Sequence, residues 1–592
     1  MKEVFLQHHS RGFWQRFHSP EQTIEAHTPE EVLPALARIE RLVEENAWYA
    51  VGFVTYDAAP GFDCALRVVS SGAAASLPLL SFGLYTAPEI LHASRLFPDP
   101  QSIKQPSVQT SAQNWCPSVD RAAYDQALDT IREHIIRGNT YQVNYTWRLR
   151  QRITGDPLLW FASMMGMTQH AAYLDTGRFV ILSASPELFF SLEGRSLITR
   201  PMKGTAPRDP DPLTDRLRAE TLQTSRKDRA ENVMIVDMMR NDLSRIAELG
   251  SVQVSRLFAL ERYSTVWQMT STVEANTRAS VTEIFRALFP AASVTGAPKA
   301  NTMKLIAGLE TTPRGLYTGA IGFMAPRRRA EFSVAIRTAI LDRTTGVVEY
   351  GVGGGIVWDS EKNAEYAECL AKAQVLWSHR PRFALLETLL WTPVEGFSLL
   401  EEHIDRISES ARYFGYPLDP PTLRHALTQV ALVLPPLPHR VRLLLDDAGH
   451  LQTEYAILAD QGIDQAADPP TEVSLMIATQ AIDSRDPFFY HKTTHRVGYD
   501  RIRSASPEGD DVLLWNERGE ITETTRANVV IERNGERITP PVSAGLLAGT
   551  YRRTLLAQGV IREGTILLSE LSQGSVVWLI NSVRGWRRAI VL

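Results

Sequence analysis

The hydrophobic pattern of this 592-residue chain breaks near residue 380 and then starts afresh. Strand and helix patterns run from about residue 120 to 377, and SHRPR (378–382) interrupts them with a proline and basic residues. A strand pattern, FALLETLLW, and a helix pattern, SLLEEHIDRISESARYFG, follow at once. At roughly 150 residues per domain, length alone suggests about four domains. The fresh strand–helix start about 210 residues from the end instead predicts two units, 1–378 and 383–592, joined by a linker at 379–382.

Composition and charge narrow the class of protein. Hydrophobic residues make up 44% and charged residues 22%, as in soluble globular proteins. With 62 Lys+Arg against 67 Asp+Glu, the net charge of −5 creates no global field for nucleic acid or an anionic membrane. The N-terminal MKEVFLQHHS has no apolar signal core, and no apolar run reaches the roughly 18 residues of a membrane span. We therefore expect a cytoplasmic protein that binds neither nucleic acid nor membranes.

The cysteines point away from two other classes. Cys64, Cys116 and Cys369 are odd in number, far apart and in no C-x-x-C pair. This pattern argues against a disulfide framework or a structural zinc site.

Several charged residues of the first unit could either bind a ligand or simply lie on a helix surface. Glu231 borders the apolar face of a helix expected over 227–250, where a carboxylate can ligate Mg²⁺ or simply interact with the helix dipole. Glu368 and Lys372 are four residues apart on another helix, and they share a face with Glu365. Taken alone, each pattern is more typical of a helix surface than of a site.

Three further features suit anionic ligands or reactive groups. Arg337 interrupts an otherwise apolar strand expected over 331–341 and needs an anionic partner. Glu187 follows a proline before apolar residues, and Lys203 lies in a turn-like PMKGT. A buried lysine would be a candidate nucleophile, whereas a lysine in a turn is usually solvated. A backbone without side chains can approach an anion closely at Gly353, Gly354 and Gly355.

The order of the motifs is more specific than any one of them. YQVN, SPE-F, P-K-G-T, DRAEN-MIVD-MRND, TGAPK, IRT and GGGIV-DS-EY-E follow one another between residues 120 and 376. The set resembles the chorismate-utilising enzymes, which include anthranilate synthase component I, aminodeoxychorismate synthase component I and isochorismate or salicylate synthases. The resemblance implies a large α+β domain of antiparallel sheets with surrounding helices.

The resemblance also implies roles for these residues. Glu231 and Glu368 match the glutamates that hold a Mg²⁺ on the ring carboxylate of chorismate, and the metal activates the ring. Glu187 matches the proposed general acid or base near the C4 hydroxyl. The contacts to the substrate carboxylates match Thr295, Arg337, Lys372 and the backbone of Gly353, Gly354 and Gly355.

Lys203 separates the members of the family. Anthranilate synthases carry a small residue in the corresponding turn, and aminodeoxychorismate synthases carry lysine. A lysine amine near C2 can attack the ring as the C4 hydroxyl leaves, after which ammonia enters at C4. Isochorismate-forming relatives have lysine where this chain has Gln142. One departure is Gln268, which aligns with a histidine of many members and cannot do acid–base work.

The second unit carries EHIDR, HKTT-R, ITE-T-AN and L-AG-YR in order. Singly, these residues suit a surface lysine, a strand-edge glutamate, a helix cap and a solvated arginine. Together they resemble class IV aminotransferases, most closely 4-amino-4-deoxychorismate lyase, and imply the two-subdomain α/β fold of that class. Lys492 then matches the Schiff-base lysine of pyridoxal 5'-phosphate, and Glu523 the partner of its pyridine nitrogen. The implied phosphate contacts are Arg406, Gly549, Thr550 and Ser582, with Arg584 as a contact to a substrate carboxylate.

The two resemblances imply one reaction sequence. The first unit would aminate chorismate with ammonia to 4-amino-4-deoxychorismate, and the second would release pyruvate and 4-aminobenzoate for folate synthesis. No cysteine lies in a Gly-x-Cys-x-Gly elbow, so ammonia must come from solution or from a separate glutamine amidotransferase subunit, which we predict as a partner. Class IV enzymes commonly dimerise, which implies a homodimer through the second unit.

Three alternatives stay open. The first unit could aminate chorismate in the anthranilate manner. The second could be a D-amino-acid or branched-chain transaminase. A regulatory module that only binds chorismate-like anions is the alternative without catalysis, and the complete set of catalytic motifs argues against it.

Overall fold

The computed structural model describes residues 1–8, 13–69, 77–96, 114–165, 168–263, 265–377, 381, 383–458 and 472–592. The chain forms two compact units. The first contains Met1–Ala206 and Ala219–Arg380, and the second contains Pro207–Arg218 and Pro381–Leu592. A short segment from the middle of the chain therefore belongs to the second unit. The linker predicted at 379–382 lies outside the described residues except for Pro381.

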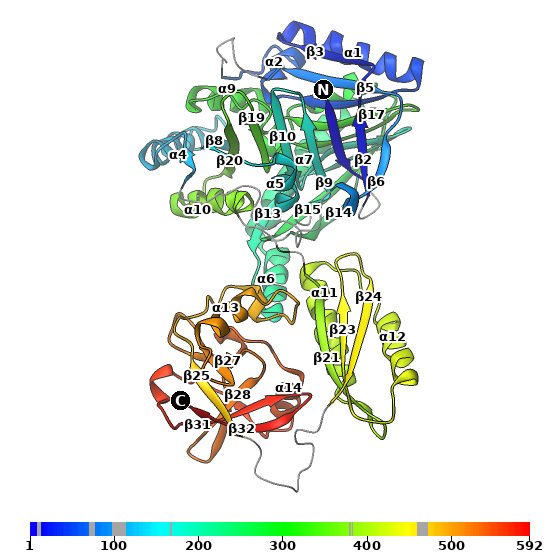
Figure 1. Cartoon of the computed structure of the whole chain (residues 1–592). Coiled ribbons are helices and arrows are strands. Elements are labelled where there is room, and N and C mark those ends of the chain that lie inside the picture. Colours follow the sequence, from blue (N-terminus) through cyan, green and yellow to red (C-terminus); the bar gives the residue numbers. More distant parts are fainter. Residues whose placement is uncertain are drawn as a thin grey trace. The chain divides into compact units, whose positions relative to one another are not determined.

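Two ten-stranded sheets form the framework of the first unit (Figure 1). Strands of one sheet are β16 (Gly296–Ala297), β8 (Gln142–Arg152), β20 (Val347–Ile356), β19 (Thr338–Asp342), β10 (Phe179–Ser185), β9 (His170–Asp175), β1 (Glu3–Gln7), β2 (Phe13–His18) and β6 (Glu89–His92), with β7 (Cys116–Pro117) beside β8. Strands of the other are β13 (Met202–Pro207), β15 (Val266–Asn276), β12 (Ser196–Arg200), β11 (Leu188–Glu193), β18 (Arg329–Val334), β17 (Ala320–Ala325), β4 (Tyr49–Val54), β5 (Leu80–Tyr85) and β3 (Gln22–Ala26), with β14 (Gln253–Arg262) beside β15.

Two of the places where the chain crosses between these sheets are adjacent. It leaves β10 and enters β11 through Pro186 and Glu187, and it leaves β18 and enters β19 through residues 335–337. Backbone hydrogen bonds join the crossings, from Val334 N–H to the Glu187 carbonyl and from Ala184 N–H to the Arg337 carbonyl. Side chains at these crossings therefore face the space between the sheets.

The continuous strand predicted over 331–341 is wrong. Arg337 has a φ of 50° between β18 and β19, so the run is two strands in different sheets. The apolar pattern continues through the break because both strands are buried, and periodicity does not register the bend.

The helices of the first unit follow their sequence signals. Asp120 caps α4 by accepting a hydrogen bond from Ala123 N–H, and Gly138 has a φ of 71° just beyond its end. Ser225 caps α7, the helix that carries Glu231. The set is α1 (Pro29–Asn46), α2 (Ala59–Phe62), α3 (Ala93–Leu96), α4 (Arg121–Ile136), α5 (Pro157–Met164), α7 (Arg226–Ser244), α8 (Val281–Leu288), α9 (Lys299–Leu309) and α10 (Lys362–Ala373), while α6 (Pro212–Thr224) spans the sequence boundary between the units.

The second unit contains two smaller sheets. One is antiparallel, in the order β22 (Gly396–Phe397), β21 (Leu385–Thr392), β23 (His439–Leu445) and β24 (Leu451–Ile457). The other is mixed, in the order β27 (Ile521–Thr524), β26 (Asp511–Trp515), β25 (Val473–Ile477), β32 (Gly585–Val591), β31 (Val576–Asn581), β28 (Asn528–Arg533), β29 (Glu536–Thr539) and β30 (Arg562–Glu563). Each sheet has its own apolar core.

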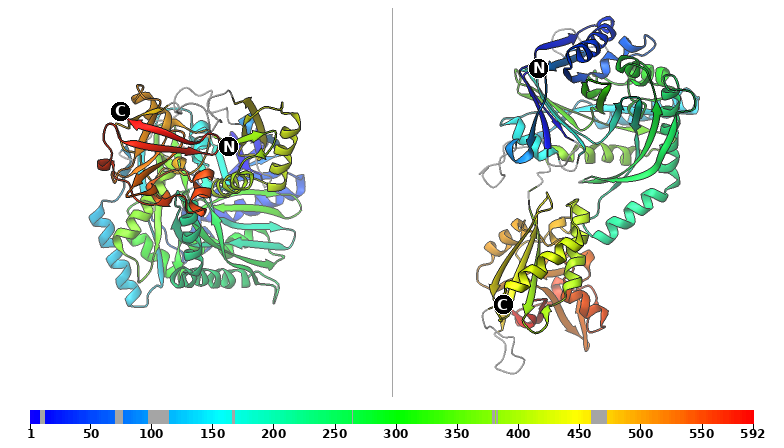
Figure 2. Two further views of the ribbon diagram at one scale, coloured as in Figure 1. Left: turned by 90° about the horizontal axis from the view of Figure 1, so that it is seen from below. Right: turned by 90° about the vertical axis from the view of Figure 1, so that its right-hand side faces the viewer.

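Helices α11 (Leu400–Phe414) and α12 (Pro420–Val433) cover one face of the smaller sheet, as the yellow ribbons of Figure 2 show. The larger sheet is accompanied by α13 (Val497–Ala505) and α14 (Thr550–Ala557). The α+β fold predicted for the first unit and the two-subdomain α/β fold predicted for the second are confirmed. Among the described residues, none of the helices combines the length and apolar content that crossing a membrane requires.

Candidate active sites

A cavity of about 320 Å³ lies in the first unit where the chain crosses between the sheets. Several elements contribute to its wall: the β10–β11 crossing, β13, α7, β20 and α10. The predicted residues that line it are Glu187, Lys203, Glu231, Arg337, Gly353, Gly354, Gly355, Glu368 and Lys372. Residues from 187 to 372 in the sequence thus meet in one place.

Glu187 is 4% exposed at the crossing from β10 to β11. Burial raises the pKa of its carboxyl to about 7, against the opposing effects of a hydrogen bond from Ser293 and the charge of Lys203. The Ser293 hydroxyl donates to Glu187 Oε1 at 2.6 Å. An acid with this pKa can both donate and accept a proton near neutral pH.

Lys203 lies on β13, partly buried and facing the glycines of β20. A Cβ atom at Gly355 would lie 2.7 Å from Lys203 Nζ and 2.2 Å from Gln142 Nε2. Glycine at 355 is therefore what leaves space for the amine. Burial lowers the pKa of Lys203, while Glu231 opposes that shift. The Gln142 amide is buried beside it, and neither its nitrogen nor its oxygen has a hydrogen-bond partner among the described residues.

Carboxylates and a cation face each other between α7 and α10. Lys372 Nζ lies 2.8 Å from Glu368 Oε1 and donates to the Gly353 carbonyl at 2.9 Å. Lys372 lowers the pKa of Glu368. Burial raises the pKa values of Glu231 and Glu365, and nearby carboxylates add to both shifts. Negative charge in this corner is thus only partly compensated.

Arg337 offers a guanidinium to an anion. It stacks over the Tyr263 ring at 5.2 Å, and within the described parts of the chain no carboxylate forms an ion pair with it. Thr295 is placed differently from the other predicted contacts. It is fully buried outside the cavity lining, its hydroxyl donates to the Ala291 carbonyl at 3.2 Å, and its neighbours Ser293 and Val294 line the wall instead.

Gln268 supports the turn that carries Lys203. Its amide nitrogen donates to the Gly204 carbonyl at 2.9 Å, and its oxygen accepts from the Thr205 hydroxyl at 3.2 Å. The residue that departs from the family histidine is therefore a positioning residue for the PMKGT segment. Sequence reasoning missed Glu365, Lys227 and Asp228 as lining residues. Spacing could have found the first two, because Glu365 shares a helix face with Glu368 and Lys227 precedes Glu231 by four residues.

A buried ion pair supports the cavity wall from behind. Arg314 Nη2 lies 2.8 Å from Glu310 Oε1, and both side chains are at most 2% exposed. Arg314 also donates to the carbonyls of Val294 at 2.8 Å and Asn144 at 2.6 Å, two residues that line the cavity. Burial opposes the charge of Arg314, but Glu310 outweighs it and raises the pKa.

Replacing Glu310 with glutamine is expected to lower the free energy of unfolding of this unit by about 3–5 kcal/mol, because Arg314 would stay buried without a counter-charge. The measurement is urea unfolding followed by tryptophan fluorescence. Glu133→Gln is the matched control, because its exposed pair with Arg137 should contribute less than about 1 kcal/mol. Equal losses in the two variants would contradict the expectation.

A second cavity, of about 230 Å³, lies in the second unit. All the predicted cofactor contacts line it: Arg406, Lys492, Glu523, Gly549, Thr550 and Ser582. Lys492 lies in a loop beside β21. The backbone N–H of Leu386 on that strand donates a hydrogen bond to the Lys492 carbonyl at 3.0 Å. Burial, helped by Arg406, lowers the pKa of Lys492 to about 8. A substantial fraction of this amine is thus neutral and nucleophilic near neutral pH.

Glu523 on β27 is 4% exposed in the same cavity. It accepts hydrogen bonds from the Tyr499 hydroxyl at 2.7 Å and the Asn528 amide at 3.2 Å. Burial raises its pKa to about 8. Because burial disfavours the negative charge of this carboxyl, a cation placed beside it would be stabilised. Tyr499 and Asn528 were not predicted, and their roles depend on contacts that spacing does not reveal.

A buried triad orients Arg406. Its Nε and Nη2 donate to the two oxygens of Glu387 at 2.8 and 2.7 Å, and His403 Nδ1 lies 2.7 Å from the same carboxylate. Arg406 and His403 outweigh the effect of burial and lower the pKa of Glu387. Helix α14 begins with Gly549 as its N-cap, and a Cβ there would lie 2.1 Å from Asn528 Oδ1. The first turn of this helix presents free N–H groups to the cavity.

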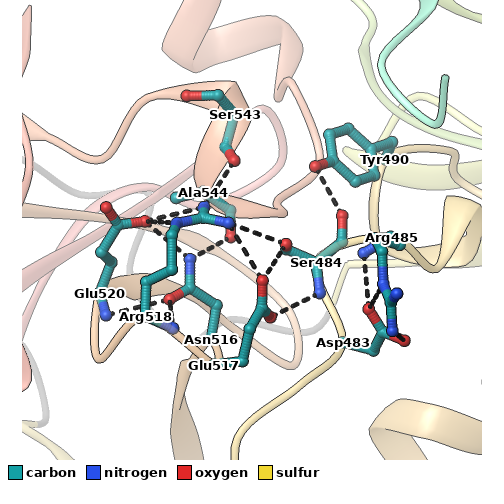
Figure 3. A network of polar contacts seen from close by, with 10 residues as sticks. All are labelled: Asp483, Ser484, Arg485, Tyr490, Asn516, Glu517, Arg518, Glu520, Ser543 and Ala544. Carbon is teal, nitrogen blue, oxygen red and sulfur yellow. Dashed lines mark hydrogen bonds and ion pairs between the residues drawn. The ribbon is translucent and has the colours of Figure 1, made fainter. Parts of the chain in front are cut away.

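A polar network joins the hairpin turn at 516–520 to the segments around Ser484 and Ser543 (Figure 3). Glu517 accepts from the hydroxyl of Ser484 at 2.6 Å, and the Tyr490 hydroxyl donates to the Ser484 carbonyl at 2.9 Å. Arg518 donates to the Ser543 carbonyl at 2.9 Å. One hairpin turn thereby restrains both the segment before Lys492 and the segment before Gly549.

Each of the two cavities has the features of an enzyme site. The first has a partly buried amine, an acid with a pKa near 7 and an arginine without a carboxylate partner, which suits an anionic substrate. Residues 2–378 match the family described as chorismate binding enzyme, and residues 384–590 match amino-transferase class IV. The chain belongs to the chorismate-binding enzymes, fused to a class IV amino-transferase domain.

Individual relatives agree with this assignment. The chain is 36% identical over 286 residues to aminodeoxychorismate synthase component 1 of Escherichia coli, covering 48% of this chain and 63% of the relative. It is 38% identical over 271 residues to anthranilate synthase component 1 of Streptomyces coelicolor, covering 45% and 52%. The match therefore spans less than two thirds of these relatives. The fold of anthranilate synthase component I from Streptococcus pneumoniae is similar, with a TM-score of 0.52, 22% identity, and coverage of 64% and 92%.

Proposed function

We propose that this chain makes 4-aminobenzoate in two steps, by amination of chorismate at C4 and then by release of pyruvate. The observation that carries the proposal is Lys203, whose amine shares a cavity with the acid Glu187 and the guanidinium of Arg337. An anthranilate-type site would need no nucleophile in this position. The match to aminodeoxychorismate synthase component 1 supports the same choice.

In the first step, the Lys203 amine would form a bond to C2 of the ring. The two conjugated ring double bonds would shift together, from C1=C2 and C5=C6 to C1=C6 and C4=C5, and the C4 hydroxyl would leave as water after protonation by Glu187. Ammonia would then form a bond to C4, the two double bonds would shift back, and the Lys203 amine would leave from C2. Chorismate and ammonia thus become 4-amino-4-deoxychorismate and water, and Arg337 would hold a carboxylate throughout.

The carboxylates of the first cavity suit Mg²⁺. Within the described residues, no group of three or more His, Cys, Asp or Glu side chains converges closely enough to hold a metal by itself. Mg²⁺ commonly takes only one or two protein carboxylates and completes its shell with water and substrate. Glu231 and Glu368 would hold it, and the partly compensated negative charge around Glu231 and Glu365 supports this. When bound, Mg²⁺ would withdraw charge toward the ring carboxylate.

The second cavity suits pyridoxal phosphate. Lys492 and Glu523 face one cavity, and Arg406 and the first turn of α14 offer donors to a phosphate. When bound, the cofactor would supply an electron sink. The freed Lys492 amine would take the proton from C4 of the ring and pass a proton to the methylene carbon of the departing enolpyruvyl group. The C3–O bond would break, and 4-aminobenzoate and pyruvate would leave.

Ammonia is proposed to come from a separate glutamine amidotransferase subunit. The three cysteines of the chain support this, because none has the glycine neighbours of a nucleophile elbow. Cys369 is buried, and burial raises the pKa of its thiol to about 11, so it is poorly suited to nucleophilic attack.

The decisive experiment incubates the purified chain with chorismate, ammonium, Mg²⁺ and pyridoxal phosphate and identifies the products. We expect 4-aminobenzoate and pyruvate in equal amounts, and accumulation of 4-amino-4-deoxychorismate when the cofactor is omitted. The appearance of anthranilate fluorescence would contradict the first half of the proposal and indicate anthranilate-type amination instead. Transfer of an amino group to a 2-oxo acid without release of pyruvate would replace the second half.

A further inference from the structure

A third cavity, of about 580 Å³, opens beside Lys492 in the second unit. It shares Lys492, Arg526, Asn581 and Ser582 with the cofactor cavity. Its volume is within the range of about 300–1,000 Å³ that is common for small-molecule sites. A molecule in this cavity would therefore lie against the proposed reaction centre and outside the phosphate contacts of Arg406 and Thr550.

Three arginines from three different elements line this cavity: Arg440, Arg526 and Arg584. Arg440 is on β23. Val441 and Leu443 of this strand face the helix-covered core, and the alternate residues Arg440 and Arg442 face the other side of the sheet. Arg526 lies in the turn between β27 and β28, and Arg584 lies in the turn between β31 and β32. Only Arg584 was suggested by the sequence.

Both turns are held firmly by their own hydrogen bonds. Thr524 N–H donates to the Ala527 carbonyl at 2.9 Å across the first turn. The Asn581 side chain accepts from the N–H groups of Val583 and Arg584 at 3.1 and 2.8 Å across the second. Arg526 and Arg584 are therefore presented from hydrogen-bonded turns, and Arg440 from a strand.

The charge of this cavity is not balanced by the protein. No Asp or Glu is among the described residues that line it, and none of the three arginines forms an ion pair there. Arg442, two residues after Arg440, instead pairs with Glu454 at 2.8 Å. Three exposed arginines that line one cavity without a counter-charge among its described lining residues favour an anion there.

We propose that Arg440, Arg526 and Arg584 form a binding subsite for a substrate that bears two carboxylates. The subsite would hold both carboxylates of the substrate and direct its amine toward Lys492, so it selects a dicarboxylate over an ordinary amino acid. This inference deepens the proposed function and rests on it for the identity of the natural substrate. Guanidinium groups suit this task because each can bind a carboxylate through two parallel hydrogen bonds.

The test uses the full-length holoenzyme and two unreactive probes, isophthalate with two carboxylates and benzoate with one. Binding is followed by the change in cofactor absorbance. We expect isophthalate to bind more tightly than benzoate, and Arg526→Met and Arg440→Met each to weaken isophthalate about tenfold or more. Added salt should weaken isophthalate more than benzoate.

Arg442→Met is the matched control, because it removes an arginine from the same strand outside the cavity. It should leave the affinity for isophthalate unchanged. Retained cofactor absorbance shows that each variant is folded, and Arg526→Lys should restore part of the affinity by restoring the charge. Equal affinities for the two probes, or unchanged affinity in Arg440→Met and Arg526→Met, would overturn the proposal. Weakened isophthalate binding in a protein that releases no pyruvate would retain the subsite and reject the proposed reaction.

Discussion

Replacing Lys203 with alanine is expected to abolish the formation of 4-amino-4-deoxychorismate, with a loss of at least about a thousandfold in kcat. Loss of a nucleophile removes a bond-forming step that the other groups of the cavity do not replace. Lys372 is bound to Glu368 and to the Gly353 carbonyl, and Glu368 outweighs burial and raises its pKa. It is therefore held as a cation. The measurement is product formation from chorismate, ammonium and Mg²⁺ by chromatography.

A second substitution separates nucleophilic from electrostatic action. Lys203→Arg keeps a cation near Glu187 but cannot form the bond to C2, so it should be as inactive as the alanine variant. Lys304→Ala, on the exposed face of α9 and outside the cavity, should keep full activity. C4 amination that survives in the alanine variant would remove the nucleophile from the mechanism. Activity in the arginine variant but not in the alanine variant would show that Lys203 acts only through its positive charge.

The second large effect is expected for Lys492→Ala, which should lose both the cofactor absorbance band near the visible edge and the release of pyruvate. Lys492 is the only lysine between residues 373 and 592, so the second unit has no other side-chain amine for the aldehyde. Borohydride reduction followed by peptide mapping should accordingly find the cofactor on the peptide around residue 492. Cofactor on another peptide would contradict the assignment.

The pH dependence of this reaction follows from burial. The pKa of Lys492 is about 8 rather than the ordinary 10.5, because burial and Arg406 disfavour its charged form. The neutral amine reacts with the aldehyde, so cofactor incorporation into the apoprotein should level off above about pH 8 and fall about tenfold per pH unit below it. Stopped-flow absorbance across pH 6–10 measures this. A midpoint near 10.5 would mean that the amine is solvated before the cofactor arrives.

The fold and most of the two sites could be predicted because their signals are local or ordered along the chain. The capping of the helix after Asp120, the glycines of β20 and the lysine of HKTT are readable as short patterns, and the structure places the last two in cavities. The bend at Arg337 was missed because apolar periodicity is the same on both sides of it. Thr295 was expected to touch the substrate, yet its hydroxyl donates to the backbone of its own turn.

By itself, the sequence determined which side chains are available and in what order: Lys203 in its turn, the glutamates of two helices, and a single lysine in the second unit. Only the tertiary structure decided which of them share a cavity and with what charge. Burial at a crossing between sheets raises the pKa of Glu187 to about 7. A strand and two turns far apart in the chain bring Arg440, Arg526 and Arg584 to one cavity, where no Asp or Glu is among the described lining residues. Both effects depend on distances and solvent exclusion between segments far apart in the chain, and neither quantity is encoded in local spacing.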